Sequence, residues 1–250
     1  MISIANTFRL KQMATKVRQS GFTLVEMAIV LVIVGFMLGG LLASLSAQVD
    51  QRDYSQTRQS MEEIREALLG YALSRGYLPC PAISSANGAE DRIVATGICT
   101  NRVGFLPWAE LGVKKTDSWN RLYRYSVTPA YSNSLLAITL SPPTARDITI
   151  QTRNAAGVLI NLSNANDIPV VVISHGKNGY GGTNNDGTLL TDTSVNNNDE
   201  KTNNTGVGTV LVSREFGDNK TTAYGEYDDI VMWVSPNTYL SKMVAVGNLP

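Results

Sequence analysis

Four carboxylates near the end of the chain are the residues best suited to binding a hard cation. They lie within one short segment, where neighbouring backbone carbonyls could supply further oxygens: Asp218, Glu226, Asp228 and Asp229. Calcium takes about six to eight such ligands. The segment lacks the spacing of an EF-hand loop, and acidic residues beside glycine are also common in turns that contact only solvent. The sequence therefore leaves a calcium site and a solvated turn open.

Ser174 and His175 are neighbouring residues of the types that could act as a nucleophile and a base. Adjacent residues on a strand point to opposite faces, and no third group can be assigned to orient the histidine. In the glycine-rich run 176–182 the order of glycine and lysine is wrong for a phosphate-binding loop. We therefore expect no catalytic residues and no enzymatic activity.

The charge distribution along the 250 residues predicts a membrane topology. Residues 1–21 contain four basic residues and no acidic one, and no charged residue occurs from Met27 to Val49. A bilayer crossing needs roughly 20 apolar residues, and a basic segment before the span stays in the cytoplasm. Everything after Asp50 is then expected across the membrane. That part is not basic enough to indicate a nucleic-acid partner.

Cys80 and Cys99 are the only cysteines, and they enclose a short loop on the translocated side. Oxidising conditions there favour a disulfide, and two buried free thiols are the alternative. A zinc site would need two more ligands, and the single histidine is remote in sequence.

Glu26 is the residue that a plain membrane anchor leaves unexplained. It lies at the start of the apolar run, where a carboxylate in lipid costs about 2.5–3.5 kcal/mol. The run Gly21-Phe22-Thr23-Leu24-Val25-Glu26, after a basic segment, resembles the cleavage and methylation motif of type IV prepilins and type II secretion pseudopilins. The resemblance covers about 25 residues.

The resemblance implies a role for three residues. Gly21 would be the last leader residue, cut by a prepilin peptidase on the cytoplasmic face, and Phe22 would become the N-methylated new N-terminus. Glu26 would pair with the N-terminal amine of a neighbouring subunit. Opposite charges attract strongly in a low-dielectric setting, and either charge alone is penalised there. The alternative is that the Glu26 side chain extends to the lipid head groups and has no role in assembly.

Apolar periodicity predicts one helix from about Phe22 to Arg75. Met61, Ile64 and Leu68 begin a stripe with helical spacing, and Gly76 and Pro79 end the pattern. Strand-like runs rich in branched and aromatic residues follow: Leu122–Val127, Leu135–Leu140, Ile148–Thr152, Val170–Ser174, Thr209–Ser213 and Ile230–Val234. Residues 79–120 read as irregular, and the Asn/Gly-rich segment 176–208 reads as a long surface excursion.

These elements predict an α+β fold of the type IV pilin kind, with the helix packed on an antiparallel sheet. We expect a leader at 1–21, a transmembrane and assembly helix at 22–49, its amphipathic second half at 50–78, and a periplasmic β domain at 79–250. Asp117-Ser118-Trp119-Asn120 resembles the family's D-x-W-G-N segment without its glycine. Asp229-Ile230-Val231-Met232-Trp233 resembles the D-I-x-x-W strand of major pseudopilins, where an aspartate at the Asp229 position helps to hold calcium.

The expected function is a minor structural subunit of a type IV pilus or type II secretion pseudopilus, waiting in the inner membrane before assembly. Its expected partners are the prepilin peptidase, other pilin or pseudopilin subunits, the inner-membrane assembly platform and membrane lipid. We expect no cofactor, and the one candidate considered is calcium at Asp229. The alternative is a periplasmic binding or enzymatic domain on a pilin-like anchor.

Overall fold

The computed structural model describes residues 21–136, 138–139, 146–205, 208–222 and 224–249, without the side chains of residues 38 and 40–44. The chain divides into two units, Met1–Val49 and Asp50–Pro250. The predicted leader 1–21 lies outside the described residues except for Gly21.

Helix α1 (Leu24–Arg75) begins in the first unit and ends in the second. It stops where Gly76 takes a φ of +83°, a left-handed conformation that favours glycine and commonly ends helices. Among the described residues, no helix offers an apolar stretch long enough to cross a membrane. The predicted span includes residues 38 and 40–44, whose side chains lie outside the described part, so the span stays a prediction.

The second unit is built on a four-stranded antiparallel sheet of order β3-β4-β7-β9. Its strands are β3 (Val103–Phe105), β4 (Arg124–Val127), β7 (Val170–Ser174) and β9 (Ile230–Val234). The central strand β7 is fully buried, as its continuous apolar sequence predicts for a strand covered on both faces.

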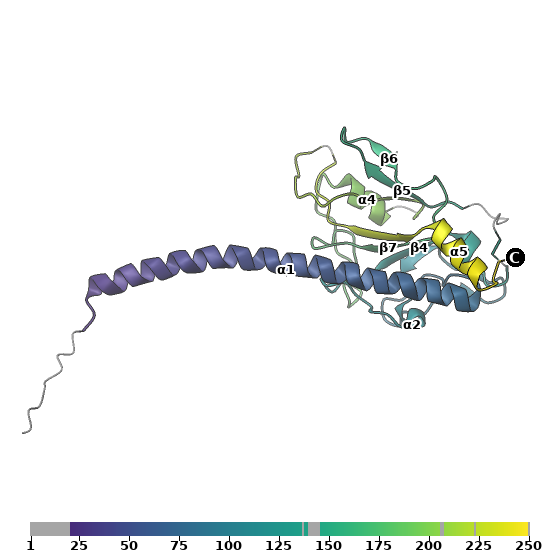
Figure 1. Cartoon of the computed structure of the whole chain (residues 1–250), viewed down its shortest axis with the longest axis horizontal. Coiled ribbons are helices and arrows are strands. Elements are labelled where there is room, and N and C mark those ends of the chain that lie inside the picture. The colour runs from purple at the N-terminus through teal and green to yellow at the C-terminus, as the bar shows by residue number, and fades with distance from the viewer. Residues whose placement is uncertain (1–20, 137, 140–145, 206–207, 223, 250) are drawn as a thin grey trace, which may run out of the picture. The chain divides into compact units, whose positions relative to one another are not determined.

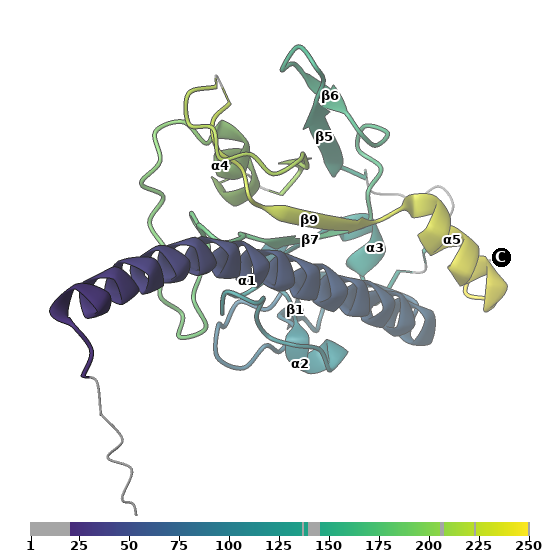
Figure 2. The same cartoon turned by 60° about the vertical axis from the view of Figure 1, so that its left-hand side comes forward.

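The two faces of β7 pack against different layers. Val170 and Val172 belong to a core shared with Met61, Ile64 and Leu68 of α1, the stripe that helical spacing predicted. On the other face, the core consists of six buried residues: Ile148, Ile150, Ile168, Val171, Ile173 and Leu211. Both views place β7 and β9 between α1 and the β5–β6 hairpin (Figure 1, Figure 2).

A second sheet of order β6-β5-β8 forms the outer layer. Its strands are β5 (Thr149–Arg153), β6 (Leu159–Asn161) and β8 (Val210–Val212), and β5 pairs with β8 in parallel. The expected antiparallel sheet is the four-stranded sheet on which α1 packs, and this second sheet with its parallel pair was not predicted. β1 (Arg92–Ile93) and β2 (Ile98–Cys99) form a separate ribbon.

Four short helices complete the described part of the second unit: α2 (Trp108–Leu111), α3 (Pro129–Ser132), α4 (Asn198–Thr205) and α5 (Pro236–Ala245). Near the C-terminus, Leu249 is buried in the α1 core and the Asn248 side chain donates to the Leu73 carbonyl at 2.7 Å. Cys80 and Cys99 are joined by a disulfide that links the start of the β domain to β2, with Cα atoms 5.2 Å apart.

Three expectations for the β domain are wrong. Residues 79–120 are not simply irregular, because they contain β1, β2, α2 and β3, and β3 pairs with β4 in the main sheet. The run Leu135–Leu140 forms no strand over its described residues, because Leu135 lies in a turn whose N–H bonds Asn133 Oδ1 at 2.8 Å, while Ile138 enters the core. The segment 176–208 is not simply a surface excursion. It contains α4, and Asn197, Asp199, Glu200 and Asn203 are buried there because each has polar partners.

Candidate functional site

The first candidate site is the start of α1. Gly21 and Phe22 precede the helix, and Phe22 is 83% exposed. Thr23 N–H and Oγ1 both donate to Glu26 Oε2 at 3.0 Å, and Glu26 N–H donates back to Thr23 Oγ1 at 3.2 Å. This reciprocal arrangement is a capping box, which satisfies otherwise unpaired donors of the first helical turn. Glu26 therefore has a partner within its own chain.

The apolar side chains behind Glu26 lie on the surface of the first unit. Leu24, Leu31 and Phe36 are 87%, 68% and 79% exposed, and the described large apolar residues from Phe22 to Met37 are all exposed. An apolar surface of this extent is typical of a segment that contacts lipid or protein.

The second candidate site is a group of three buried carboxylates, from Glu200 in α4 and from Asp228 and Asp229 just before β9. One oxygen of each lies within 4.8 Å of the others. Burial raises the pKa of Asp228 to about 8, with Glu200 and Asp229 adding to the effect. Burial also raises the pKa of Glu200, and Asp229 adds to it. Added positive charge at this site would favour the ionised forms of Asp228 and Glu200.

Side chains and backbone around the three carboxylates satisfy some oxygens and leave others without a partner. Asn178 N–H donates to Asp228 Oδ2 at 2.6 Å, and the Asn178 amide donates to Glu200. Asp228 Oδ1 and Asp229 Oδ1 have no hydrogen-bond partner among the described residues. His175 Nδ1, also without one, lies 3.4 Å from Asp229 Oδ1. The oxygen-rich donor set and its two unpartnered oxygens fit a hard divalent cation.

Of the four acids expected near a cation, the structure brings together only two. Asp218 is exposed, and Glu226 pairs with Lys220 at 3.3 Å. Glu200 completes the group from a part of the chain that the sequence reading treated as surface. The sequence signal available for it was weak, because an acidic residue in the first turn of a short polar helix is also a common helix-stabilising feature.

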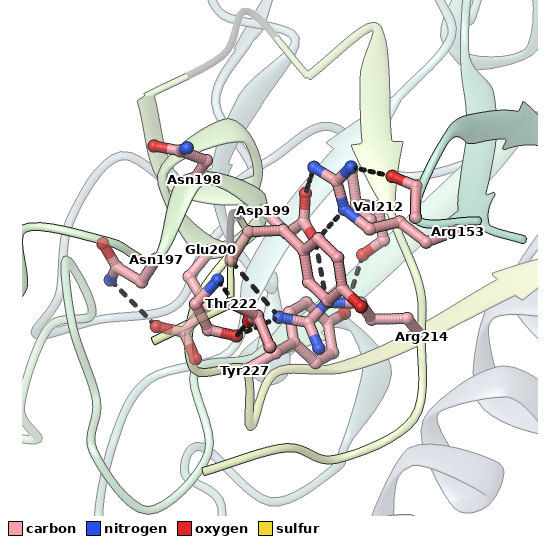
Figure 3. Close-up of polar contacts among 12 residues, drawn as sticks. Arg153, Asn197, Asn198, Asp199, Glu200, Val212, Arg214, Thr222 and Tyr227 are labelled. Carbon is pink, nitrogen blue, oxygen red and sulfur yellow. Dashed lines mark hydrogen bonds and ion pairs between the residues drawn. The ribbon is translucent and has the colours of Figure 1, made fainter. Parts of the chain in front are cut away.

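Two arginines fix α4 beside these carboxylates. Arg153 of β5 forms a two-point ion pair with Asp199 at 2.7 and 2.8 Å, and Arg214 Nε bonds the same carboxylate at 2.7 Å. Figure 3 shows both guanidinium groups converging on Asp199. The side chain of Asp199 is 1% exposed, so each contact is strengthened by exclusion of water. The ion pairs hold Glu200, the next residue, in position.

Helix α1 also reaches this region. The Tyr54 ring packs edge-on against Trp119, with ring centroids 4.8 Å apart. Burial raises the pKa of the Tyr54 hydroxyl, and the Asp228 carboxylate adds to the effect. Lys177, next to Asn178, forms an ion pair with Asp50 at 2.6 Å. The loop that binds Asp228 and Glu200 is therefore tied to α1.

The Asp117-Ser118-Trp119-Asn120 segment is a tight turn fixed to β7. Asp117 Oδ1 accepts from Trp119 N–H and Arg121 N–H at 3.0 and 2.9 Å, and Ser174 Oγ donates to Asp117 Oδ2 at 2.6 Å. Asn120 takes a φ of +64°, a conformation that asparagine tolerates better than most residues. Ser174 and His175 thus contact different carboxylates.

Comparison with known proteins bears on the N-terminal site. The prokaryotic N-terminal methylation motif matches residues 16–42. The chain carries the prepilin-type signature. This signature indicates a type IV pilin-like or pseudopilin-like protein, and it implies processing by a prepilin peptidase and assembly with other pilin subunits. No curated protein and no solved structure compared with the chain matches it.

Proposed function

We propose that the chain is a minor structural subunit of a type IV pilus or type II secretion pseudopilus. It is cut after Gly21, N-methylated at Phe22, held in the inner membrane by α1 and delivered by an assembly platform to a filament. The methylation motif at residues 16–42 is the observation that carries this proposal. The exposed apolar surface of the first unit supports it, since bundled helices in a filament would cover that surface.

In the proposed filament, Glu26 changes partner. Before assembly its carboxylate accepts from Thr23, and during assembly it pairs with the methylated amine of a neighbouring subunit. The amine supplies a full positive charge, which a hydroxyl and a backbone N–H cannot, so the exchange favours assembly in a low-dielectric setting. The globular unit then lies outside the helical core in a fold of the pilin kind.

The first test is the mature N-terminus. Mass spectrometry of the membrane-extracted protein should find a chain starting at N-methylated Phe22. An intact Met1, or a cut near Ala47, would instead support a periplasmic binding or enzymatic domain on a pilin-like anchor.

The second test separates the charge of Glu26 from its capping role. Glu26→Gln keeps an acceptor for Thr23, because glutamine also serves in capping boxes, but it cannot pair as an ion. We expect it to insert into the membrane normally and to be lost from filaments. Glu63→Ala, at an exposed acid of the same helix, is the matched control and should assemble as the wild type does. Normal assembly of Glu26→Gln would refute the ion-pairing role.

We further propose that Glu200, Asp228 and Asp229 hold a calcium ion, with Asp229 as a central ligand. The cation would add positive charge beside the three buried carboxylates and would bridge α4 to the start of β9. Adding calcium to EDTA-treated protein should raise its unfolding midpoint, because a ligand that binds only the folded state stabilises it. Asp229→Asn should abolish the shift and Asp218→Asn should keep it. An unchanged wild-type midpoint in millimolar calcium would refute the site.

A further inference from the structure

The outer sheet β6-β5-β8 has two edges, and the residues that the structure describes protect only one of them. At the β8 edge, the Asn203 side chain takes the place of a neighbouring strand. Its Oδ1 accepts from Val212 N–H at 2.7 Å and its Nδ2 donates to the Val212 carbonyl at 2.9 Å. The Tyr227 hydroxyl donates to the same carbonyl at 2.7 Å. No further strand can pair at Val212.

The β6 edge is open among the described residues. β6 pairs with β5 in the register Gln151↔Asn161, Thr152↔Ile160 and Arg153↔Leu159. Leu162 N–H bonds the Ile150 carbonyl and Asn154 N–H bonds the Val158 carbonyl. Because hydrogen-bonded and non-hydrogen-bonded pairs alternate in an antiparallel ladder, the backbone groups of Leu159 and Asn161 point away from β5.

The β6 edge carries no charged side chain and no proline that would prevent strands from pairing between molecules. Residues 154–164 contain no charged residue and no proline, whereas natural edges are commonly protected by lysine or proline. The apolar side chains along the edge are exposed, by 57% at Val158, 38% at Leu159, 45% at Ile160 and 51% at Leu162. Figure 1 and Figure 2 both show the β5–β6 hairpin at the margin of the ribbon.

We propose that β6 is a self-association surface that pairs with β6 of a second copy of this chain. A second copy is a suitable partner because β6 is apolar and uncharged. When two β6 strands pair, no like charges face each other and no charge is left unpaired. The outward groups fix the register: Leu159 pairs with Asn161 of the other copy and Asn161 with its Leu159, which gives four backbone hydrogen bonds. Ile160 then faces Ile160 directly across a two-fold axis. The result is one continuous six-stranded sheet.

This contact closes on itself, since a two-fold interface uses the same patch on both copies. It therefore differs from the repeating head-to-tail contacts that extend a filament, and it would join subunits of two filaments or two subunits in the membrane. A strand of three residues buries less than a standard interface, so we expect a weak dimer that depends on concentration. The dimer does not require the proposed pilin function, because both strands belong to the Asp50–Pro250 unit, which has its own core.

Sedimentation equilibrium of residues 50–250, produced with the disulfide formed, tests the association. We expect the average mass to rise from monomer toward dimer with concentration. Ile160→Lys places two ammonium groups opposite each other and should weaken association at least about tenfold, the effect of 1.4 kcal/mol. Val195→Lys, the same change at a residue 93% exposed, is the matched control and should leave association unchanged.

Cross-linking tests the register, since both native cysteines are in the disulfide. Under mild oxidation Ile160→Cys should form a covalent dimer faster than Leu162→Cys, because only residue 160 faces itself. Circular dichroism and a native melting curve establish that each variant is folded. A mass that stays monomeric up to about 1 mM, far above the concentration at which standard interfaces form, would overturn the proposal. Equal weakening by both lysine variants would place the contact elsewhere, and faster cross-linking at 162 would refute the register.

Discussion

Replacing Asp228 by asparagine should stabilise the metal-free protein at neutral pH and weaken its response to pH. Asp228 is 6% exposed, and its pKa is raised from 3.8 to about 8 by burial and by the carboxylates of Glu200 and Asp229. Between these two pH values the folded state holds a proton on Asp228 that the unfolded chain has released. Folding then takes up a proton, so the free energy of unfolding falls as pH rises through this window.

The size of the effect follows from the shift. Each pH unit is worth about 1.36 kcal/mol at most, so the raised pKa of Asp228 costs up to about 6 kcal/mol at pH 8 relative to pH below 4. Relaxation of the site and water entry reduce that upper limit. Asparagine keeps an oxygen that can accept from Asn178 N–H, as Asp228 Oδ2 does, but it does not ionise. The variant should therefore avoid the cost.

The assay is urea unfolding of residues 50–250 in EDTA at pH values from 5 to 8, followed by tryptophan fluorescence. Asp228→Asn should exceed the wild type in stability by a few kcal/mol at pH 8, and the difference should shrink steadily toward pH 5. Asp218→Asn, at an exposed carboxylate, should follow the wild type at every pH. In millimolar calcium the order should reverse, because only the wild type retains all three ligands. A variant that is less stable in EDTA at pH 8, or a difference that does not depend on pH, would refute the reasoning.

Three further outcomes are expected. Thr23→Val removes the hydroxyl of the capping box and should speed amide hydrogen exchange in the first turn of α1 in micelles. Thr23→Ser keeps the hydroxyl and should not speed the exchange. Equal exchange rates in the two variants would contradict the cap. Replacing Cys80 and Cys99 by serine should lower the free energy of unfolding by about 3 kcal/mol, because the disulfide joins residues 19 positions apart. Chemical denaturation measures this loss of stability. Asn203→Leu leaves the Val212 N–H unpaired, while the Val212 carbonyl keeps the Tyr227 hydroxyl as its donor. The change should cost about 1–3 kcal/mol, with faster amide exchange in β8 as the local readout.

Hydrophobic periodicity located the elements that bury apolar side chains. The stripe of Met61, Ile64 and Leu68 faces the core, and α1 ends at Arg75 as predicted. Strand runs such as Val170–Ser174 and Ile230–Val234 match β7 and β9. These elements are visible in the sequence because their burial depends on side-chain type alone.

The parts that depend on polar pairing were not visible. Asp199 and Asn203 lie in an Asn/Gly-rich segment, and they are buried only because Arg153 and the Val212 backbone come from elsewhere in the chain to meet them. Strand runs carry no information on direction, so the parallel pairing of β5 with β8 was missed. The capping box of Thr23 and Glu26 could have been recognised from the spacing Thr-x-x-Glu.

The parallel pairing of β5 with β8 also sets an order in time for folding. β5 and β6 are joined by a short turn and can pair as soon as both exist, whereas β8 follows β5 by roughly 60 residues, a closure that slows folding. At about 5–20 residues per second, synthesis delivers β8 some 3–12 s after β5. During that interval the β5–β6 ribbon has neither Asn203 nor β8 along its inner edge. Overproduced chains should therefore aggregate through the uncovered edge of β5, residues 149–153, before they finish folding, and a chaperone that holds extended strands should raise the yield.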